Sequence, residues 1–132
     1  MIVLDTHVTI WFITNTKFGK RSTSIVRKAL EEDRLFVSAI SFWEVAMLIS
    51  KKRLRALTSA AELRVKILSA GMQERALSGE ICILAGDLEN LHADPADRLI
   101  AATAIELNAT LVTADERLLR WRHSLTRQNA EH

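Results

Sequence analysis

Short apolar runs of about four residues alternate with longer helical patterns along this chain of 132 residues. A short apolar run bounded by turn residues is typical of a buried strand, and its alternation with helical segments predicts repeated β-α units. Such units build a parallel sheet. The predicted strands are Ile2–Leu4, Leu35–Ser38, Gln73–Leu77 and Thr110–Thr113. The pattern therefore predicts the α/β fold class.

Helix signals fill the segments between these strands. Ser41 begins an apolar helix that runs to Ser50 and is expected to be largely enclosed. Glu44 stands three residues after Ser41, the spacing of a capping box. Asp94 followed by Pro95 is a strong helix start. The helix after it, Ala96–Leu107, is small and apolar on all sides, so we expect it to be buried. Further helices are predicted after the first strand, around residues 25–30, over 58–70, after Ser78 and near Asp115.

Four carboxylates lie where a predicted strand ends or a predicted helix begins: Asp5, Glu44, Asp97 and Asp115. The carboxyl ends of parallel strands open on one edge of the sheet, where ligands bind. Each acid alone also has a simpler explanation, because negative charge is favoured at a helix N-terminus. Four of them at one edge cannot all stay ionised without a cation. The set therefore predicts an acidic metal site.

Oxygen ligands of this kind suit Mg²⁺ or Mn²⁺, which act on phosphates in many enzymes. His7 is two residues from Asp5 and raises the idea of zinc or a general base, but a single histidine more often packs or forms a hydrogen bond. His92 is interpreted as a loop residue. The only cysteine, Cys82, lies in an apolar run and is expected to be buried and inert.

The net charge of +2 does not by itself indicate nucleic-acid binding. Two basic clusters attract phosphate backbones or are simply solvated, and the two interpretations stay equally open. They are Lys51, Lys52, Arg53 and Arg55, and then Arg117, Arg120, Arg122 and Arg127. No apolar stretch approaches the roughly 20 residues of a membrane span, and no secretion signal is recognisable. We expect one cytoplasmic domain over residues 1–132.

Four segments resemble, in order and spacing, the signature blocks of PIN-domain nucleases, and among these the VapC toxins of toxin–antitoxin pairs. They are Leu4-Asp5-Thr6-His7, Ser38 to Ala46, His92 to Ala104 and Leu111 to Asp115. The resemblance extends from Met1 to about Leu119, and the Asp-Pro-Ala-Asp-Arg segment makes it specific. Residues 15–20 and the tail beyond Trp121 carry no matching signature.

The resemblance implies a three-layer fold with a central parallel sheet of four to five strands flanked by helices. It also implies a metal-dependent endoribonuclease that uses Mg²⁺ or Mn²⁺ and acts on RNA such as tRNA or rRNA. Asp5 and Asp97 are then the principal metal ligands, Glu44 and Asp115 complete the catalytic set, and Thr6 and Thr113 are supporting hydroxyls. A VapB-type antitoxin and homodimerisation are further implications, with Trp11, Phe12 and Trp121 as candidate interface residues.

Two other interpretations remain. In the first, the chain is an inactive PIN-fold binding protein, although such a protein has no reason to keep four costly acids together. Alternatively it is a receiver-like module that binds Mg²⁺ and accepts a phosphoryl group on an aspartate. That module needs an acidic pair after its first strand and a lysine after its last, whereas Asp5 stands alone and Asp115 is followed by Glu116. We regard this second alternative as the weaker one.

Overall fold

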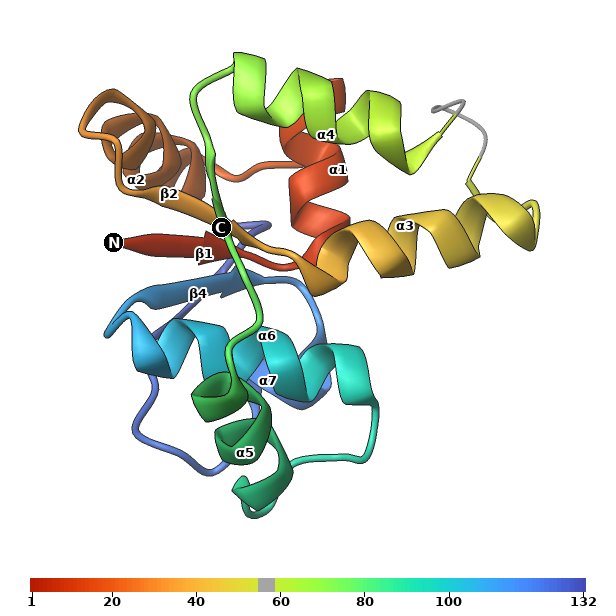
Figure 1. Ribbon diagram of the computed structural model, residues 1–132. Coiled ribbons are helices and arrows are strands. Elements are labelled where there is room, and N and C mark those ends of the chain that lie inside the picture. The colour runs from red at the N-terminus through yellow and green to blue at the C-terminus, as the bar shows by residue number, and fades with distance from the viewer. Residues whose placement is uncertain (55–58) are drawn as a thin grey trace.

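The computed structural model describes residues 1–54 and 59–132, and its centre is a five-stranded, fully parallel sheet with the strand order β3-β2-β1-β4-β5. The strands are β1 (Ile2–Leu4), β2 (Leu35–Ser38), β3 (Gln73–Arg75), β4 (Thr110–Thr113) and β5 (Arg127–Asn129). The helices are α1 (Thr6–Thr14), α2 (Lys20–Glu31), α3 (Ile40–Ser50), α4 (Ala60–Ser69), α5 (Gly79–Asp87), α6 (Pro95–Glu106) and α7 (Glu116–Leu119). Figure 1 shows the helices on both sides of the sheet. The predicted fold class is therefore confirmed.

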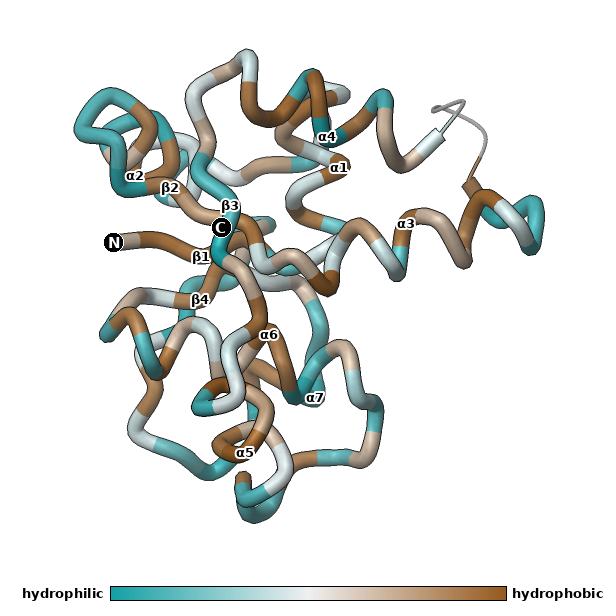
Figure 2. Tube along the Cα trace, in the orientation of Figure 1, coloured by the Kyte–Doolittle hydropathy of each residue, from teal (hydrophilic) through white to brown (hydrophobic). Residues whose placement is uncertain are grey.

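The central strand β1 is buried on both faces, which explains its uninterrupted apolar sequence. Ile2 and Leu4 point into a core that includes residues of α1, α2, α3 and α4. Val3 points to the opposite face and packs with residues of α6 and α7. The apolar segments that line these two cores are brown along the trace in Figure 2. Because successive strand residues face opposite sides, three residues are enough to join both helical layers.

The direction in which successive strands are added to the sheet reverses beside β1. The chain adds β2 and β3 on one side of β1, then crosses over and adds β4 and β5 on the other. In such sheets the crevice for a ligand opens at the carboxyl ends of the two strands where the direction changes, here β1 and β4. The flavodoxin-like order typical of receiver modules is 2-1-3-4-5. The observed order therefore argues against the receiver-like alternative.

The start of α6 is as predicted. Asp94 is the N-cap of this helix, and its side chain accepts a hydrogen bond from the backbone N–H of Ala96 at 3.0 Å. Pro95 is the first helical residue. The α6 helix contributes seven buried residues, among them Ile100 and Asp97. Small side chains such as Ala101 let it approach the sheet closely. A predicted buried helix is thus confirmed.

The expectations for α3 are wrong in two respects. The helix begins at Ile40 rather than after Ser41, and no side chain caps it, so Glu44 is not part of a capping box. The helix is also not enclosed: only Ser41 and Val45 are buried, and the side chain of Trp43 is 55% exposed. Figure 1 shows that α3 extends away from the sheet. The apolar sequence of this helix therefore does not mean burial within the chain.

Smaller differences concern the edges of the fold. The third strand ends at Arg75 rather than Leu77, and the tail without a matching signature supplies the edge strand β5. Cys82 is exposed on α5, contrary to expectation, while Trp121 is buried at 4% exposure and is therefore not a surface residue. Residues 55–58, including Arg55 of the first basic cluster and the predicted helix start at Thr58, lie outside the described residues. In the described part of the chain, every helix is too short or too polar to cross a bilayer.

Candidate metal centre

The carboxyl ends of β1 and β4 open into a cavity of about 310 Å³ that is lined by an excess of acids. Six carboxylate side chains line it, namely Asp5, Glu44, Asp94, Asp97, Asp115 and Glu131. Arg117 is the one lysine or arginine among the described residues that line it, and His7, Thr6 and Trp11 also contribute. All four acids singled out from the sequence therefore reach the same cavity, at the edge of the sheet where the topology predicts a ligand.

Asp5 joins the end of β1 to the beginning of α1. Its carboxylate caps the helix by accepting a hydrogen bond from the backbone N–H of Val8 at 2.9 Å, and it accepts a second one from the hydroxyl of Thr113. Burial raises the pKa of Asp5 to about 6, although both hydrogen bonds oppose that rise and the charge of Asp97 adds to it. A cation bound beside this acid would offset the cost of burying its charge.

Asp115 is tied to Asp5 through the same threonine. The backbone N–H of Asp115 donates to the Thr113 hydroxyl at 3.0 Å, so that one side chain on β4 positions both acids. Asp115 is also the N-cap of α7 and accepts from the backbone N–H of Arg117 at 2.8 Å. Partial burial raises its pKa, but hydrogen bonds and charge from Arg117 outweigh this and leave the pKa below its ordinary value.

Glu44 reaches the cavity from the first turns of α3. It accepts a hydrogen bond from the hydroxyl of Thr6, which lies 2.9 Å from the hydroxyl of Ser41. Burial raises the pKa of Glu44, the Thr6 hydrogen bond lowers it, and the charges of Asp97 and Asp94 raise it further. The two threonines expected to support the acids, Thr6 and Thr113, therefore each hold one carboxylate.

Asp97 is buried on α6, and two side chains contact its Oδ2 atom. The Nε2 atom of His92 lies 2.7 Å away, and a guanidinium nitrogen of Arg117 lies 3.4 Å away. Arg117 also contacts Asp115 at 3.0 Å, so it bridges the two acids. Burial raises the pKa of Asp97, the His92 hydrogen bond lowers it, and the charges of Asp94 and Asp115 raise it.

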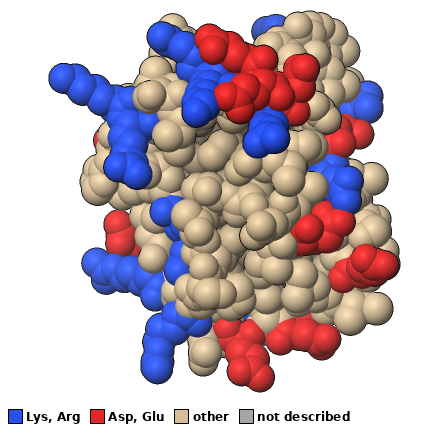
Figure 3. Space-filling model, turned by 90° about the vertical axis from the view of Figure 1, so that its left-hand side faces the viewer, with Lys and Arg blue, Asp and Glu red and all other residues tan. Residues whose placement is uncertain are grey.

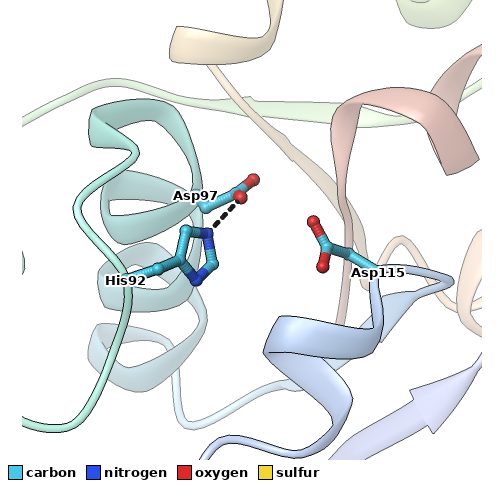
Figure 4. Close-up of side chains that lie close together, drawn as sticks. All are labelled: His92, Asp97 and Asp115. Carbon is cyan, nitrogen blue, oxygen red and sulfur yellow. Dashed lines mark hydrogen bonds and ion pairs between the residues drawn. The ribbon is translucent and has the colours of Figure 1, made fainter.

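The side chains in this cavity fit a divalent cation. Three of its carboxylates have raised pKa values because they are buried and lie near one another. The side chains of His92, Asp97 and Asp115 each offer one ligand atom, and these atoms lie within 4.8 Å of one another (Figure 4). Asp5 and Glu44 line the same cavity but stand outside this tightest group. Oxygen-rich sites of this kind suit hard cations.

Two residues that contact Asp97, His92 and Arg117, are not among the site residues that the sequence predicts. His92 is a loop residue, as interpreted, but its ring lies against Asp97 rather than in solvent. A histidine shortly before a helix-starting Asp-Pro pair gives no local sign of this contact, because the contact depends on how the loop returns to α6. The sequence places Arg117 only in a basic cluster.

Another member of that cluster, Arg127, has a different role. Its guanidinium donates hydrogen bonds to three backbone carbonyls, those of Leu118, Trp121 and His123, at 2.7–2.9 Å. Burial lowers its pKa. Arg127 therefore holds the segment after α7 in place and is not a free surface charge for RNA.

Comparisons with known proteins agree with this geometry. The family model of the PIN domain matches residues 2–123. Ribonuclease VapC22 of Mycobacterium tuberculosis is 32% identical over 127 residues, which cover 92% of each chain. Among solved structures, VapBC-1 from nontypeable Haemophilus influenzae matches with a TM-score of 0.71 at 23% identity over 100% of both chains. VapBC2 from Rickettsia felis, bound to a DNA fragment from its promoter, matches with a TM-score of 0.69 at 22% identity over 98% of both chains.

Proposed function

Because this chain belongs to the PIN domain family and, within it, to the VapC ribonucleases, we propose that it is the toxin of a toxin–antitoxin pair and hydrolyses RNA with a divalent cation. The observation that carries this proposal is the convergence of Asp5, Asp97 and Asp115 on one cavity at the switch point of the sheet. These acids come from three separate elements, and the burial of the first two leaves negative charge that a cation offsets. An inactive binding protein does not need this costly arrangement.

We assign Asp5 and Asp97 as the principal ligands of Mg²⁺ or Mn²⁺, with Glu44 and Asp115 completing the catalytic set. A bound cation of this kind supplies polarisation of a phosphoryl oxygen and a more acidic water. Thr113 holds the carboxylate of Asp5 in orientation, and Thr6 does the same for Glu44. Arg117 has a side chain 58% exposed at the cavity, where its guanidinium faces the phosphate of an entering RNA.

The expected partners are RNA, a VapB-type antitoxin and a second copy of the chain. The antitoxin follows from the VapBC complexes among the structural relatives. Trp43 on α3 and Val65 and Leu68 on α4 are exposed and replace Trp121 as candidate contact residues for a protein partner. A cytoplasmic location and a single domain over residues 1–132 belong to the same proposal.

Cleavage of pooled cellular RNA by the purified chain tests this function without a guess about the target. With Mg²⁺ or Mn²⁺ we expect discrete fragments that carry 5′-phosphate and 3′-hydroxyl ends, and no fragments in chelator. Loss of a residue that only forms a hydrogen bond to a metal ligand typically lowers activity by roughly 10–100-fold. Asp97→Asn removes a charge that holds the cation itself, so we expect a larger fall in activity.

Asp33→Asn is the matched control for this experiment. Asp33 is exposed in a turn with a φ of 56°, a conformation that asparagine also adopts readily. We expect this variant to cleave like the wild type. Cleavage that persists in chelator or in Asp97→Asn would contradict a metal-dependent mechanism, and no cleavage by any variant would favour the inactive binding protein.

A further inference from the structure

His92 lies on the loop between α5 and α6, outside the set of acids assigned to the reaction. Its Nε2 atom is 2.7 Å from Oδ2 of Asp97, and its side chain is 19% exposed. Figure 4 shows the imidazole beside the Asp97 carboxylate, with the Asp115 side chain across from both. The other ring nitrogen, Nδ1, is buried and has no hydrogen-bond partner among the described residues.

The Nε2 atom is thus the ring nitrogen of His92 that contacts Asp97, while Nδ1 has no partner among the described residues. The hydrogen bond from Nε2 to Oδ2 fixes one of the two carboxylate oxygens of Asp97. The second carboxylate oxygen can still face a cation.

The loop that carries His92 is held in place by Arg98, the residue next to Asp97. The Arg98 guanidinium donates to five backbone carbonyls at 2.6–3.2 Å, those of Ala85, Gly86, Leu88, Leu91 and His92. The indole N–H of Trp121 fixes the same loop by donating to the carbonyl of Glu89 at 2.7 Å. Because Arg98 spans the loop, the backbone of His92 cannot move away from α6 without breaking several of these bonds.

We propose that His92 is a positioning residue that orients Asp97 toward the cation, and that Arg98 acts by holding His92 in place. This inference rests on the proposed function, since it needs Asp97 to be a ligand. Outer hydrogen bonds of this kind fix the orientation of ligating side chains and increase their affinity for a metal. Direct binding of the metal by Nε2 is the competing arrangement, and it would require the bond from His92 to Asp97 to break.

The affinity for Mn²⁺, measured from the electron paramagnetic resonance signal of free Mn²⁺, tests this role without any assay of RNA cleavage. In His92→Leu we expect binding to weaken by roughly 10–100-fold. His92→Gln places an amide N–H near the position of Nε2, so we expect it to recover binding to within about threefold of the wild type. His132→Gln changes an exposed histidine that is not among the residues lining the cavity, and it serves as the control.

A double substitution tests whether Arg98 acts through His92. Arg98→Lys keeps the charge but cannot reach five carbonyls, so we expect weaker Mn²⁺ binding. If Arg98 acts only by holding His92, His92→Leu combined with Arg98→Lys binds no more weakly than His92→Leu alone. Additive losses would overturn this part of the proposal. Equal thermal unfolding of His92→Leu and His92→Gln in chelator shows that a folding defect is not the cause.

Three results would overturn the role of His92. Unchanged Mn²⁺ affinity in His92→Leu, in a wild type that binds and cleaves, would remove this inference and leave the proposed function standing. A nitrogen coupling from histidine in the pulsed spectrum of bound Mn²⁺ would make His92 a direct ligand instead. A wild type that does not bind Mn²⁺ at all would overturn the proposed metal-dependent function as well.

Discussion

The burial of Asp5 lowers the free energy of unfolding of the metal-free chain at neutral pH. Its pKa is 3.8 as an ordinary acid and about 6 in the folded chain, because burial disfavours its charge. The folded state therefore binds this proton more tightly than the unfolded state. The stability that the protonated group contributes is fully present below about pH 4 and is lost as the pH rises through about 6. The difference amounts to about 3 kcal/mol at pH 7.

We therefore expect Asp5→Asn to raise the free energy of unfolding of the metal-free chain at pH 7, and to change it far less at pH 4.5. Denaturation by urea in chelator at the two pH values measures this. Asp33→Asn, on an exposed turn, is expected to have little effect at either pH. An equal effect of Asp5→Asn at both pH values would show that its charge is not the cause.

Arg117 competes with a cation for the carboxylates of Asp97 and Asp115. Since its side chain is mostly exposed, water screens these contacts and their effect is modest. We expect Arg117→Gln to bind Mn²⁺ up to about fivefold more tightly in titration calorimetry. Arg120→Gln removes an equal charge from the residue that ends α7, where it pairs with Glu116. The same gain in Arg120→Gln would indicate a general effect of net charge rather than competition.

At the scale of elements, the beginning of α2 is fastened to the end of the chain. The backbone N–H of Gly19 donates to the carbonyl of Ala130 at 2.9 Å, and that of Arg21 donates to the carbonyl of His132 at 2.9 Å. A Cβ atom at Gly19 would lie 2.1 Å from the backbone carbon of His132. Glycine at this position therefore allows the tail after β5 to pack against α2.

We expect Gly19→Ala to lower the free energy of unfolding by roughly 1–3 kcal/mol, because the tail must shift. Gly86→Ala on α5 is the matched control, since a Cβ there meets nothing within 4 Å. It is expected to raise stability by up to about 1 kcal/mol, because alanine favours a helix. Chemical denaturation of both variants measures the difference, and a destabilised Gly86→Ala together with an unchanged Gly19→Ala would contradict this account.

For the whole molecule, a cation bound in this cavity would join the end of β1, α3, α6 and the segment after β4, because the acids proposed to hold it come from all four. Binding to the folded state alone stabilises it by about 2.7 kcal/mol at a free concentration of 100 times Kd. We expect the midpoint of thermal unfolding to rise with Mn²⁺ in the wild type and to stay nearly constant in Asp97→Asn. The same rise with a monovalent salt of equal ionic strength would indicate screening rather than a site.

The charge of the whole molecule supports a local rather than a general attraction for RNA. The face shown in Figure 3 carries lysine and arginine side chains as well as acidic ones, around a middle without charged residues. With a net charge of only +2, the molecule as a whole attracts a phosphate backbone weakly. We therefore expect RNA to be recognised mainly near the cavity.

Local signals in the sequence were sufficient to predict much of this protein. The apolar run of β1, the Asp94-Pro95 start of α6 and the four acids at element boundaries each depend on a few neighbouring residues, so they can be recognised without the fold. The strand order cannot be recognised in this way, because no local signal indicates that β4 pairs with β1 and so brings Asp115 near Asp5. The exposure of α3, the contact of His92 with Asp97 and the bridge formed by Arg117 also depend on packing between distant segments, and only the tertiary structure determines them.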